Sequence, residues 1–203
     1  MNTLHVLMWA VLGLAVGATL APTAARLAAV PDRRLYRLVI AMTTTVTCAV
    51  LAHRYSVTPA MVALTVFGSV GVLLGTVDVL VQRLPRTLVW PTCAAVAALF
   101  ATEEIGDGAD MCRLSRAAVG AIALVGGYLG VALASRGGLG AGDVRAAFLV
   151  GGVLGWHGWS ALLAGTVLGF LATGAISAAW CRRRTTIPHG PGMLAGAFAA
   201  LLL

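Results

Sequence analysis

The feature that most constrains the fold is a series of continuous apolar runs separated by short polar stretches. Several runs reach about 18 residues or more, the length of a bilayer-crossing helix, which exceeds what one buried core helix needs. The runs are rich in Ala, Leu, Val and Gly, and they lack the alternating ten-residue pattern of a transmembrane barrel. The sequence therefore predicts an all-α, polytopic membrane protein.

The charge content agrees with this class. Of the 203 residues, 60% are hydrophobic and 10% are charged, whereas a soluble domain has about a quarter charged residues. All fourteen basic residues are arginines, which give a net charge of +7 and lie in short stretches between apolar runs. That placement encodes membrane topology, and no basic arm is long enough to follow a nucleic-acid backbone. We expect contacts with membrane lipids and no nucleic-acid partner.

The apolar runs predict about eight transmembrane helices within a single domain, residues 1–203. The expected segments are Leu4–Ala29, Leu38–Ala52, Pro59–Leu80, Leu88–Thr102, Leu114–Ala134, Asp143–Trp156, Ser160–Trp180 and Gly192–Leu203. The last has twelve residues and rises only about 18 Å at 1.5 Å per residue, so whether it spans fully is left open. The first run lacks a preceding basic region and is read as a span, not a cleaved signal.

Charged stretches orient these segments. The arginines of 26–37 and 182–184 mark the cytoplasmic side, and the acidic stretch Glu103–Asp110 marks the outside, which places the N-terminus outside. We expect a multi-pass protein of the cell inner (plasma) membrane. Five tryptophans lie near the expected span ends and predict an aromatic belt: Trp9, Trp90, Trp156, Trp159 and Trp180.

The cysteines predict neither a zinc site nor a disulfide framework. Cys48, Cys93, Cys112 and Cys181 form no C-x-x-C pair. We expect no metal and no cofactor.

Two aspartates stand out among the seven acidic residues. Five acids lie in polar connecting stretches: Asp32, Glu103, Glu104, Asp107 and Asp110. Asp78 instead closes one apolar run, and Asp143 opens another after a glycine-rich stretch. The two runs should cross the membrane in opposite directions, so both carboxylates should lie at the cytoplasmic edge. An ionisable residue at membrane depth is a functional hypothesis by default.

Two neighbouring carboxyl groups can hydrolyse a peptide bond without a metal. One carboxylate deprotonates a water, and the other, holding their shared proton, donates to the carbonyl oxygen. Asp143 should begin a helix and Asp78 should end one, so the helix dipoles predict Asp143 as the base and Asp78 as the acid. Gly140 and Gly142 permit positive φ and close backbone approach, and we expect a bend there.

Simpler interpretations exist for each residue. A single aspartate at a span end is often a capping or snorkelling group, and Arg145 could be an interface anchor. His157 and His189 read as ordinary polar loop residues. The pattern Gly165-x-x-x-Gly169 predicts helix packing. A phosphate-binding loop is excluded because the chain has no lysine and no strand precedes the glycines.

Three motifs follow one another in the sequence. Gly138 and Gly140-Ala141-Gly142-Asp143, with Arg145 after them, resemble the GxGD motif of the type IV prepilin peptidases, a family of membrane aspartic proteases. Asp78 with Leu84-Pro85 resembles the first aspartate motif, and Ile187-Pro188-His189-Gly190-Pro191 resembles a C-terminal I-P-x-G-P motif. The resemblance covers about residues 70–203.

The resemblance implies a membrane aspartic endopeptidase that removes the leader of type IV prepilin-like precursors at the cytoplasmic face. It implies catalytic roles for Asp78 and Asp143. It implies motif or substrate-positioning roles for Gly138, Gly140, Gly142, Arg145, Pro85, Pro188, Gly190 and Pro191.

The sequence differs from the usual family pattern and resembles a short form of the family, without its cytoplasmic insert. The Pro31–Arg37 stretch contains no zinc-binding insert with paired C-x-x-C motifs, and Val16–Pro22 lacks the asparagine of members that methylate the new N-terminus. We therefore expect residues 59–203 to be the catalytic part and residues 1–58 to be degenerate N-terminal spans, without methyltransferase activity.

Two other functions stay open. Acids within a membrane protein also mark the proton relays of small proton-coupled transporters, and helices broken at Gly or Pro mark transport sites. However, both acids are expected at one face, and no internal repeat is evident. A non-catalytic scaffold for pilus or secretion assembly is the third possibility, against which the intact acid pair argues. The identity of the pilin-like substrate and the oligomeric state are open.

Overall fold

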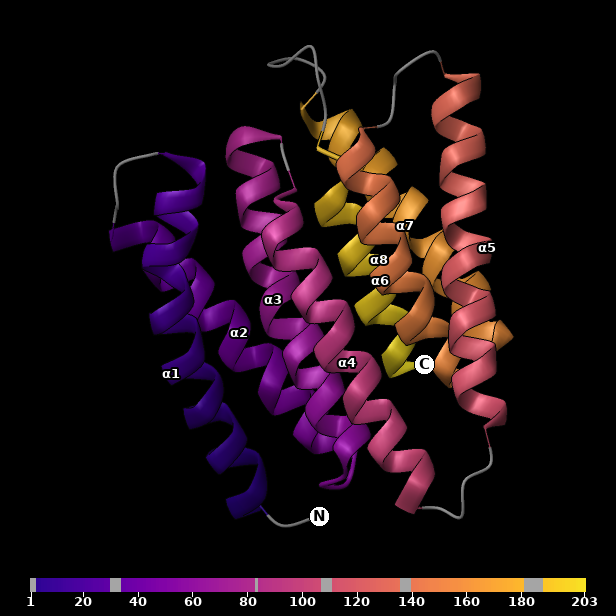
Figure 1. Cartoon of the computed structure of the whole chain (residues 1–203). Helices are drawn as coiled ribbons and strands as arrows, with labels where there is room; N and C mark the ends of the chain where they lie inside the picture. Colours follow the sequence, from indigo (N-terminus) through magenta and orange to yellow (C-terminus); the bar gives the residue numbers. More distant parts are fainter. Residues whose placement is uncertain (1–2, 30–33, 83, 107–110, 136–139, 181–187) are drawn as a thin grey trace.

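The structure, a computed structural model, describes residues 3–29, 34–82, 84–106, 111–135, 140–180 and 188–203. These ranges contain eight α-helices and no strand, which confirms the predicted all-α class. The helices run alternately up and down the bundle (Figure 1). They are α1 (Thr3–Ala28), α2 (Arg34–Arg54), α3 (Pro59–Val81), α4 (Arg86–Gly106), α5 (Cys112–Ala134), α6 (Ala141–His157), α7 (Trp159–Trp180) and α8 (Gly190–Leu202).

Six of the helices in the described ranges are long and apolar enough to cross a membrane: α1, α2, α3, α4, α5 and α7. The chain is therefore a multi-pass membrane protein. The other two helices are shorter, with 17 residues in α6 and 13 in α8.

Several helices extend beyond the apolar segments that predicted them. α2 begins at Arg34 instead of Leu38, and α4 continues through Glu103 and Glu104 to Gly106. Neighbouring residues hold the two acids: Glu103 accepts a hydrogen bond from the Ala60 N–H, and Glu104, only 2% exposed, lies 3.8 Å from the Arg113 guanidinium. The predicted acidic loop is therefore partly helical, and Asp107 and Asp110 lie outside the described residues.

Helix α3 lies at the centre of the bundle. Of its apolar span-length segment, 61% is buried, against 17% for α1 and for α7. It packs against α1, α2, α4 and α8. Leucines and valines are exposed along the outer faces of α1 and α7, where a bilayer would cover them.

Glycines let two pairs of helices approach backbone to backbone. A Cβ added to Gly155 of α6 would lie 2.8 Å from the Arg116 carbonyl oxygen of α5. In the second pair, a Cβ on Gly169 of α7 would lie 3.2 Å from Met193 Cα of α8, and Gly165 faces Leu154 and Ala200. This close packing of small residues is typical of membrane helices, and it confirms the packing role predicted for Gly165 and Gly169.

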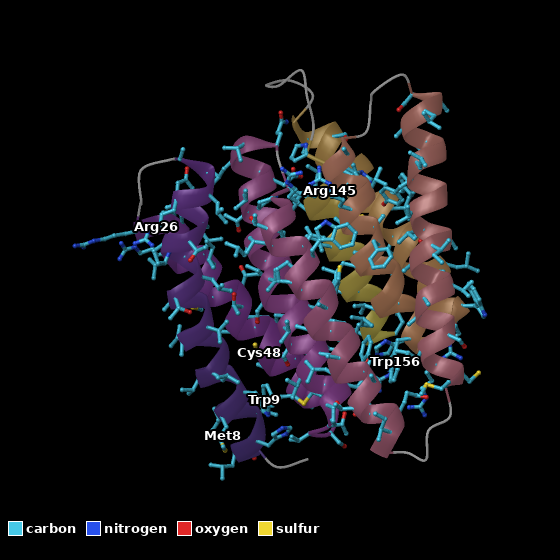
Figure 2. The ribbon with its side chains drawn as sticks, viewed as in Figure 1. Met8, Trp9, Arg26, Cys48, Arg145 and Trp156 are labelled. Carbon is cyan, nitrogen blue, oxygen red and sulfur yellow. The ribbon has the colours of Figure 1, made fainter. Side chains whose placement is uncertain are left out.

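The predicted tryptophan belt is wrong for Trp156. This ring is only 4% exposed and stacks on Phe100 at a centroid distance of 4.2 Å. Trp156 therefore belongs to the core between α4 and α6, because α6 is enclosed by its neighbours. Figure 2 shows Trp9 and Trp156 toward one end of the bundle and Arg26 and Arg145 toward the other.

Candidate functional site

A cavity of about 910 Å³ opens at the end of the bundle where α3 ends and where α4 and α6 begin. Both predicted catalytic residues, Asp78 and Asp143, line it. The end of α1 contributes Leu27, Ala28 and Ala29 to its wall. Four other residues that the sequence singled out lie in the same lining: Pro85, Gly140, Gly142 and Arg145. Gly138 lies outside the described residues.

Asp78 lies in the last turn of α3 and is buried, with 5% of its surface exposed. Its backbone carbonyl accepts a hydrogen bond of 2.8 Å from the Gln82 N–H, which closes the helix with Gln82 in the left-handed conformation at φ 53°. Its carboxylate Oδ2 accepts a hydrogen bond of 3.0 Å from the Gly190 N–H. The side chain thus joins the end of α3 to the beginning of α8.

Gly190 is fitted closely to this carboxylate. A Cβ at this position would lie 2.8 Å from Asp78 Oδ2 and 3.2 Å from Asp78 Cγ, so the contact requires glycine. Pro191 follows in the first turn of α8, where a missing N–H is harmless. Pro188 is buried just before it. The described part of the Ile187–Pro191 motif, residues 188–191, therefore builds the helix end that holds Asp78.

Asp143 lies in the first turn of α6 and is half-buried. Its Oδ2 accepts a hydrogen bond of 3.1 Å from the Gly140 N–H, and its own N–H donates to the Gly140 carbonyl at 3.0 Å. This reciprocal pair satisfies two groups at the helix start that have no partner inside the helix. It also holds the carboxylate at the cavity wall.

Neither glycine uses the positive φ that it permits. Gly140 is extended, with φ −78° and ψ 150°, and Gly142 is part of α6. Within the described ranges, the glycine with positive φ is Gly158. The close approach expected of Gly142 is present, because an added Cβ would lie 3.1 Å from Leu84 Cβ. Its lack of a side chain lets the start of α6 pack against the segment before α4.

The helix-dipole argument does not separate the two acids. It considered only the helix to which each aspartate belongs. In the structure, Asp78 also accepts an N–H at the N-terminus of α8, as Asp143 does at the N-terminus of α6. Both carboxylates therefore meet the positive end of a helix dipole.

His189 is a polar residue near this site to which sequence reasoning gave no role. Its Nε2 lies 2.9 Å from the hydroxyl oxygen of Tyr128, and its ring packs against Tyr128 and Phe170. Burial lowers the pKa of His189 below its ordinary value of 6.5, and the negative charge of Asp143 opposes this shift. The prediction of an ordinary loop histidine is wrong, and its place inside the Pro188–Pro191 motif was the available signal.

Arg145 and Pro85 shape the rim of the cavity. The Arg145 Nε donates a hydrogen bond of 3.0 Å to the Ala141 carbonyl, one turn back on α6. The Pro85 carbonyl accepts from the Leu88 N–H at 3.1 Å and so begins α4. Arg86 also lines the cavity. The site thus combines two carboxylates with a basic rim.

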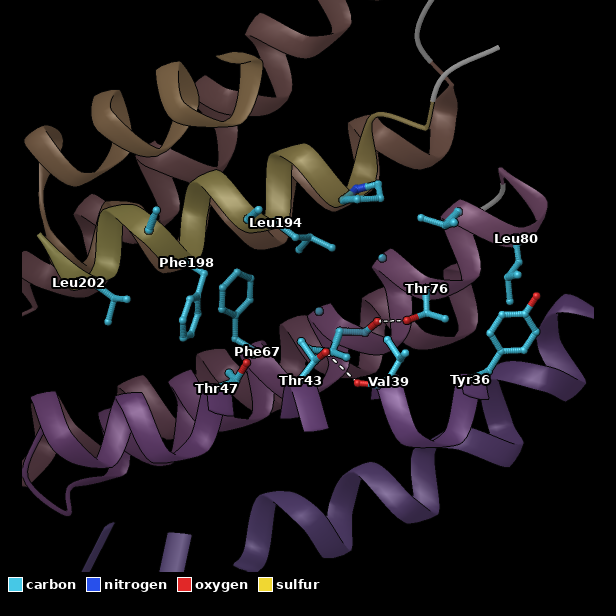
Figure 3. Close-up of a pocket in the computed structure, with 18 of the residues that line it drawn as sticks. Tyr36, Val39, Thr43, Thr47, Phe67, Thr76, Leu80, Leu194, Phe198 and Leu202 are labelled. Atoms are coloured by element: carbon cyan, nitrogen blue, oxygen red, sulfur yellow. Dashed lines mark hydrogen bonds between the residues drawn. The ribbon is translucent and has the colours of Figure 1, made fainter. Parts of the chain in front are cut away.

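A second cavity of about 650 Å³ lies between α2, α3 and α8 (Figure 3). Its lining has no carboxylate, histidine or arginine. Figure 3 shows Thr43 and Thr76 in its wall, and each hydroxyl donates to a carbonyl of its own helix, at 2.7 Å to Val39 and 2.8 Å to Val72. With these donors satisfied, the cavity presents a mainly apolar surface.

Within the described ranges, no group of three or more His, Cys, Asp or Glu side chains could hold a metal ion. Searches of protein-family models, curated proteins and solved structures found nothing that matches this chain. The function is therefore inferred from the residues and their geometry.

Proposed function

We propose that the chain is a membrane aspartic endopeptidase of the prepilin-peptidase type, which cleaves the leader peptide of type IV prepilin-like precursors. One observation carries the proposal: Asp78 and Asp143, from two different helices, line one cavity together with Pro85, Gly142 and Arg145. Two separate motifs supply these residues, and a third, Ile187–Pro191, follows them in the order of that family. N-methylation is not part of the proposal, because Val16–Pro22 lacks the expected asparagine.

The two carboxylates divide the work of hydrolysis. One takes a proton from a water as that water attacks the scissile carbonyl carbon, and the other donates a proton to the carbonyl oxygen. A proton then passes to the leaving amine as the C–N bond breaks. Backbone N–H groups of Gly190 and Gly140 fix one oxygen of each carboxylate. In this mechanism the other two oxygens face the water and the peptide.

The proposal places the cavity at the cytoplasmic face of the cell inner membrane. Arg26, Arg86 and Arg145 lie at or near the end of a helix that faces this end of the bundle, and arginines favour the cytoplasmic side. All eight helices then belong to the membrane domain, with the N-terminus outside. At 1.5 Å per residue α8 rises only about 20 Å. It is enclosed by α3, α6 and α7, so it need not match the full bilayer.

The decisive experiment replaces each aspartate with asparagine. We expect Asp78→Asn and Asp143→Asn each to reduce leader cleavage at least about 100-fold, because each removes a group that transfers a proton. Cleavage is measured on a panel of prepilin-like precursors with the purified protein in lipid vesicles. Membrane accumulation of both variants should match the unmodified chain.

Glu103→Gln is the matched control. Glu103 accepts a hydrogen bond of 2.9 Å from the Ala60 N–H at the opposite end of the bundle, and a glutamine oxygen can accept the same bond. Normal processing by either aspartate variant would rule out the two-carboxylate mechanism. Solute uptake into vesicles that depends on Asp78, without peptide cleavage, would instead indicate a transporter.

A further inference from the structure

We propose that His189, anchored by the Tyr128 hydroxyl, is a positioning residue for Asp78. The proposal rests on the peptidase function proposed above. The family resemblance gives His189 no role, because it occupies the variable position of the I-P-x-G-P pattern.

Three contacts fix the imidazole. Its Nε2 lies 2.9 Å from the Tyr128 hydroxyl, and its ring centroid lies 5.4 Å from that of Tyr128 and 5.4 Å from that of Phe170. Tyr128 is itself only 2% exposed and stacks on Phe170 at 5.6 Å. The partners come from α5 and α7, so two helices hold one side chain that immediately precedes α8.

This anchor lies one residue from the hydrogen bond on Asp78. The Gly190 N–H that donates to Asp78 Oδ2 belongs to the peptide bond that joins His189 to Gly190. The His189 carbonyl also accepts a hydrogen bond of 3.1 Å from the Met193 N–H, which starts the first turn of α8. Releasing the imidazole would free the segment that carries the donor, and Asp78 would lose a fixed orientation.

The negative charge of Asp143 also acts on the imidazole. The imidazole packs against Tyr128 from α5 and Phe170 from α7, and it lies within electrostatic range of Asp143 from α6. Asp78 of α3 accepts a hydrogen bond from Gly190, the residue that follows His189. Because burial lowers the pKa of His189, the ring is neutral at neutral pH. A neutral ring adds no cation beside Asp143, so the two aspartates can retain their shared proton.

The first test compares Tyr128→Phe, His189→Phe and His189→Gln in precursor cleavage. We expect Tyr128→Phe and His189→Phe each to lower kcat at least about tenfold, with KM changed less than about threefold, because the substrate contacts remain (tenfold is 1.4 kcal/mol). His189→Gln should stay within about threefold of the unmodified kcat, since its amide can bond to the Tyr128 hydroxyl.

Tyr55→Phe is the matched control for this series. The Tyr55 hydroxyl donates to the Leu201 carbonyl at 2.6 Å, so this variant removes the same kind of group at the other end of α8. It should lose stability as Tyr128→Phe does but keep the unmodified kcat. Equal kcat in the unmodified chain, Tyr128→Phe and His189→Phe would overturn the proposal, as would an equal loss of kcat in Tyr55→Phe.

The second test needs no activity. NMR of the chain with isotope-labelled histidine, assigned through His189→Gln, follows the titration of the imidazole. Asp143→Asn should lower the pKa of His189 further, because it removes the charge that opposes burial, whereas Glu103→Gln should leave it unchanged. An unchanged pKa in Asp143→Asn would refute the link to Asp143. If no precursor is cleaved by the unmodified chain, the peptidase function fails while this titration still decides the placement of His189.

Discussion

The backbone of Gly190 lies so close to the Asp78 carboxylate that no side chain fits between them. The Cβ of an alanine would lie 2.8 Å from Asp78 Oδ2, where real Cβ atoms do not approach. We expect Gly190→Ala to displace either the carboxylate or the start of α8, and so to lower leader cleavage at least about tenfold, a change of 1.4 kcal/mol. Cleavage of a precursor in vesicles measures this effect.

Gly71→Ala provides the comparison for Gly190→Ala. An added Cβ at Gly71 of α3 would lie 3.6 Å from Leu194, an ordinary contact. Alanine also favours a helix by about 0.5–1 kcal/mol over glycine, so this variant should be at least as stable as the unmodified chain and fully active. Full activity of Gly190→Ala would show that the site tolerates a Cβ at this position and would contradict the close fit.

His189 also predicts how stability depends on pH. Its pKa is below 6.5 in the folded chain, because burial disfavours the cation. Between the folded value and 6.5, the unfolded chain binds more protons, so stability rises with pH across this window and falls as pH is lowered through it. His189→Gln should remove this part of the pH dependence.

The measurement is the thermal midpoint of unfolding in detergent, from about pH 7.5 to about pH 5, across the range where histidine titrates. Only the difference between the unmodified chain and His189→Gln is assigned to this residue, since the carboxylates titrate in both. Parallel curves for the two proteins would contradict a neutral, buried His189.

At the scale of the helices, charged side chains far from the site satisfy helix ends. Glu103 accepts from the Ala60 N–H at the start of α3. Arg116 donates to the carbonyls of Gly155 and Trp156 at the end of α6, at 2.8 Å and 2.6 Å. These are the backbone groups that a helix leaves without internal partners. Residues that the sequence marked only as topology signals therefore also hold helix ends.

Arg116 should consequently contribute to stability more than an exposed arginine does. We expect Arg116→Met to lower the free energy of unfolding by about 2 kcal/mol, because it leaves two carbonyls without a charged donor. Arg34→Met, at the exposed start of α2, should change it by less than about 0.5 kcal/mol. Thermal unfolding of both variants in the same detergent is the measurement, and equal losses would contradict the role given to Arg116.

At the scale of the whole molecule, sequence reasoning predicted the helical class and the two acids that line one cavity. Continuous apolar runs specify membrane helices because each must satisfy its own backbone hydrogen bonds. Successive helices run in opposite directions, and this brings the end of one helix and the start of another to the same side of the bundle. This is why Asp78 and Asp143 could be paired before their shared cavity was known.

The contacts between distant helices could not be predicted in this way. A helix that is apolar on all sides has no polar face to indicate its neighbours. Nothing in the pattern therefore revealed that α8 meets α3, or that Tyr128 meets His189. The role of Gly142 could not be predicted for a related reason. Glycine permits both an unusual φ and close packing, and only the position of Leu84 shows that Gly142 allows close packing.

The link between Asp78 and Gly190 has a consequence for how the molecule is made. These residues are 112 positions apart. At about 5–20 residues per second, the ribosome adds Gly190 roughly 6 to 22 s after Asp78. During that interval the carboxylate lacks the donor that orients it in the finished bundle. The site therefore forms late in synthesis, and the proposed peptidase would acquire its oriented Asp78 carboxylate only once α8 had joined the bundle.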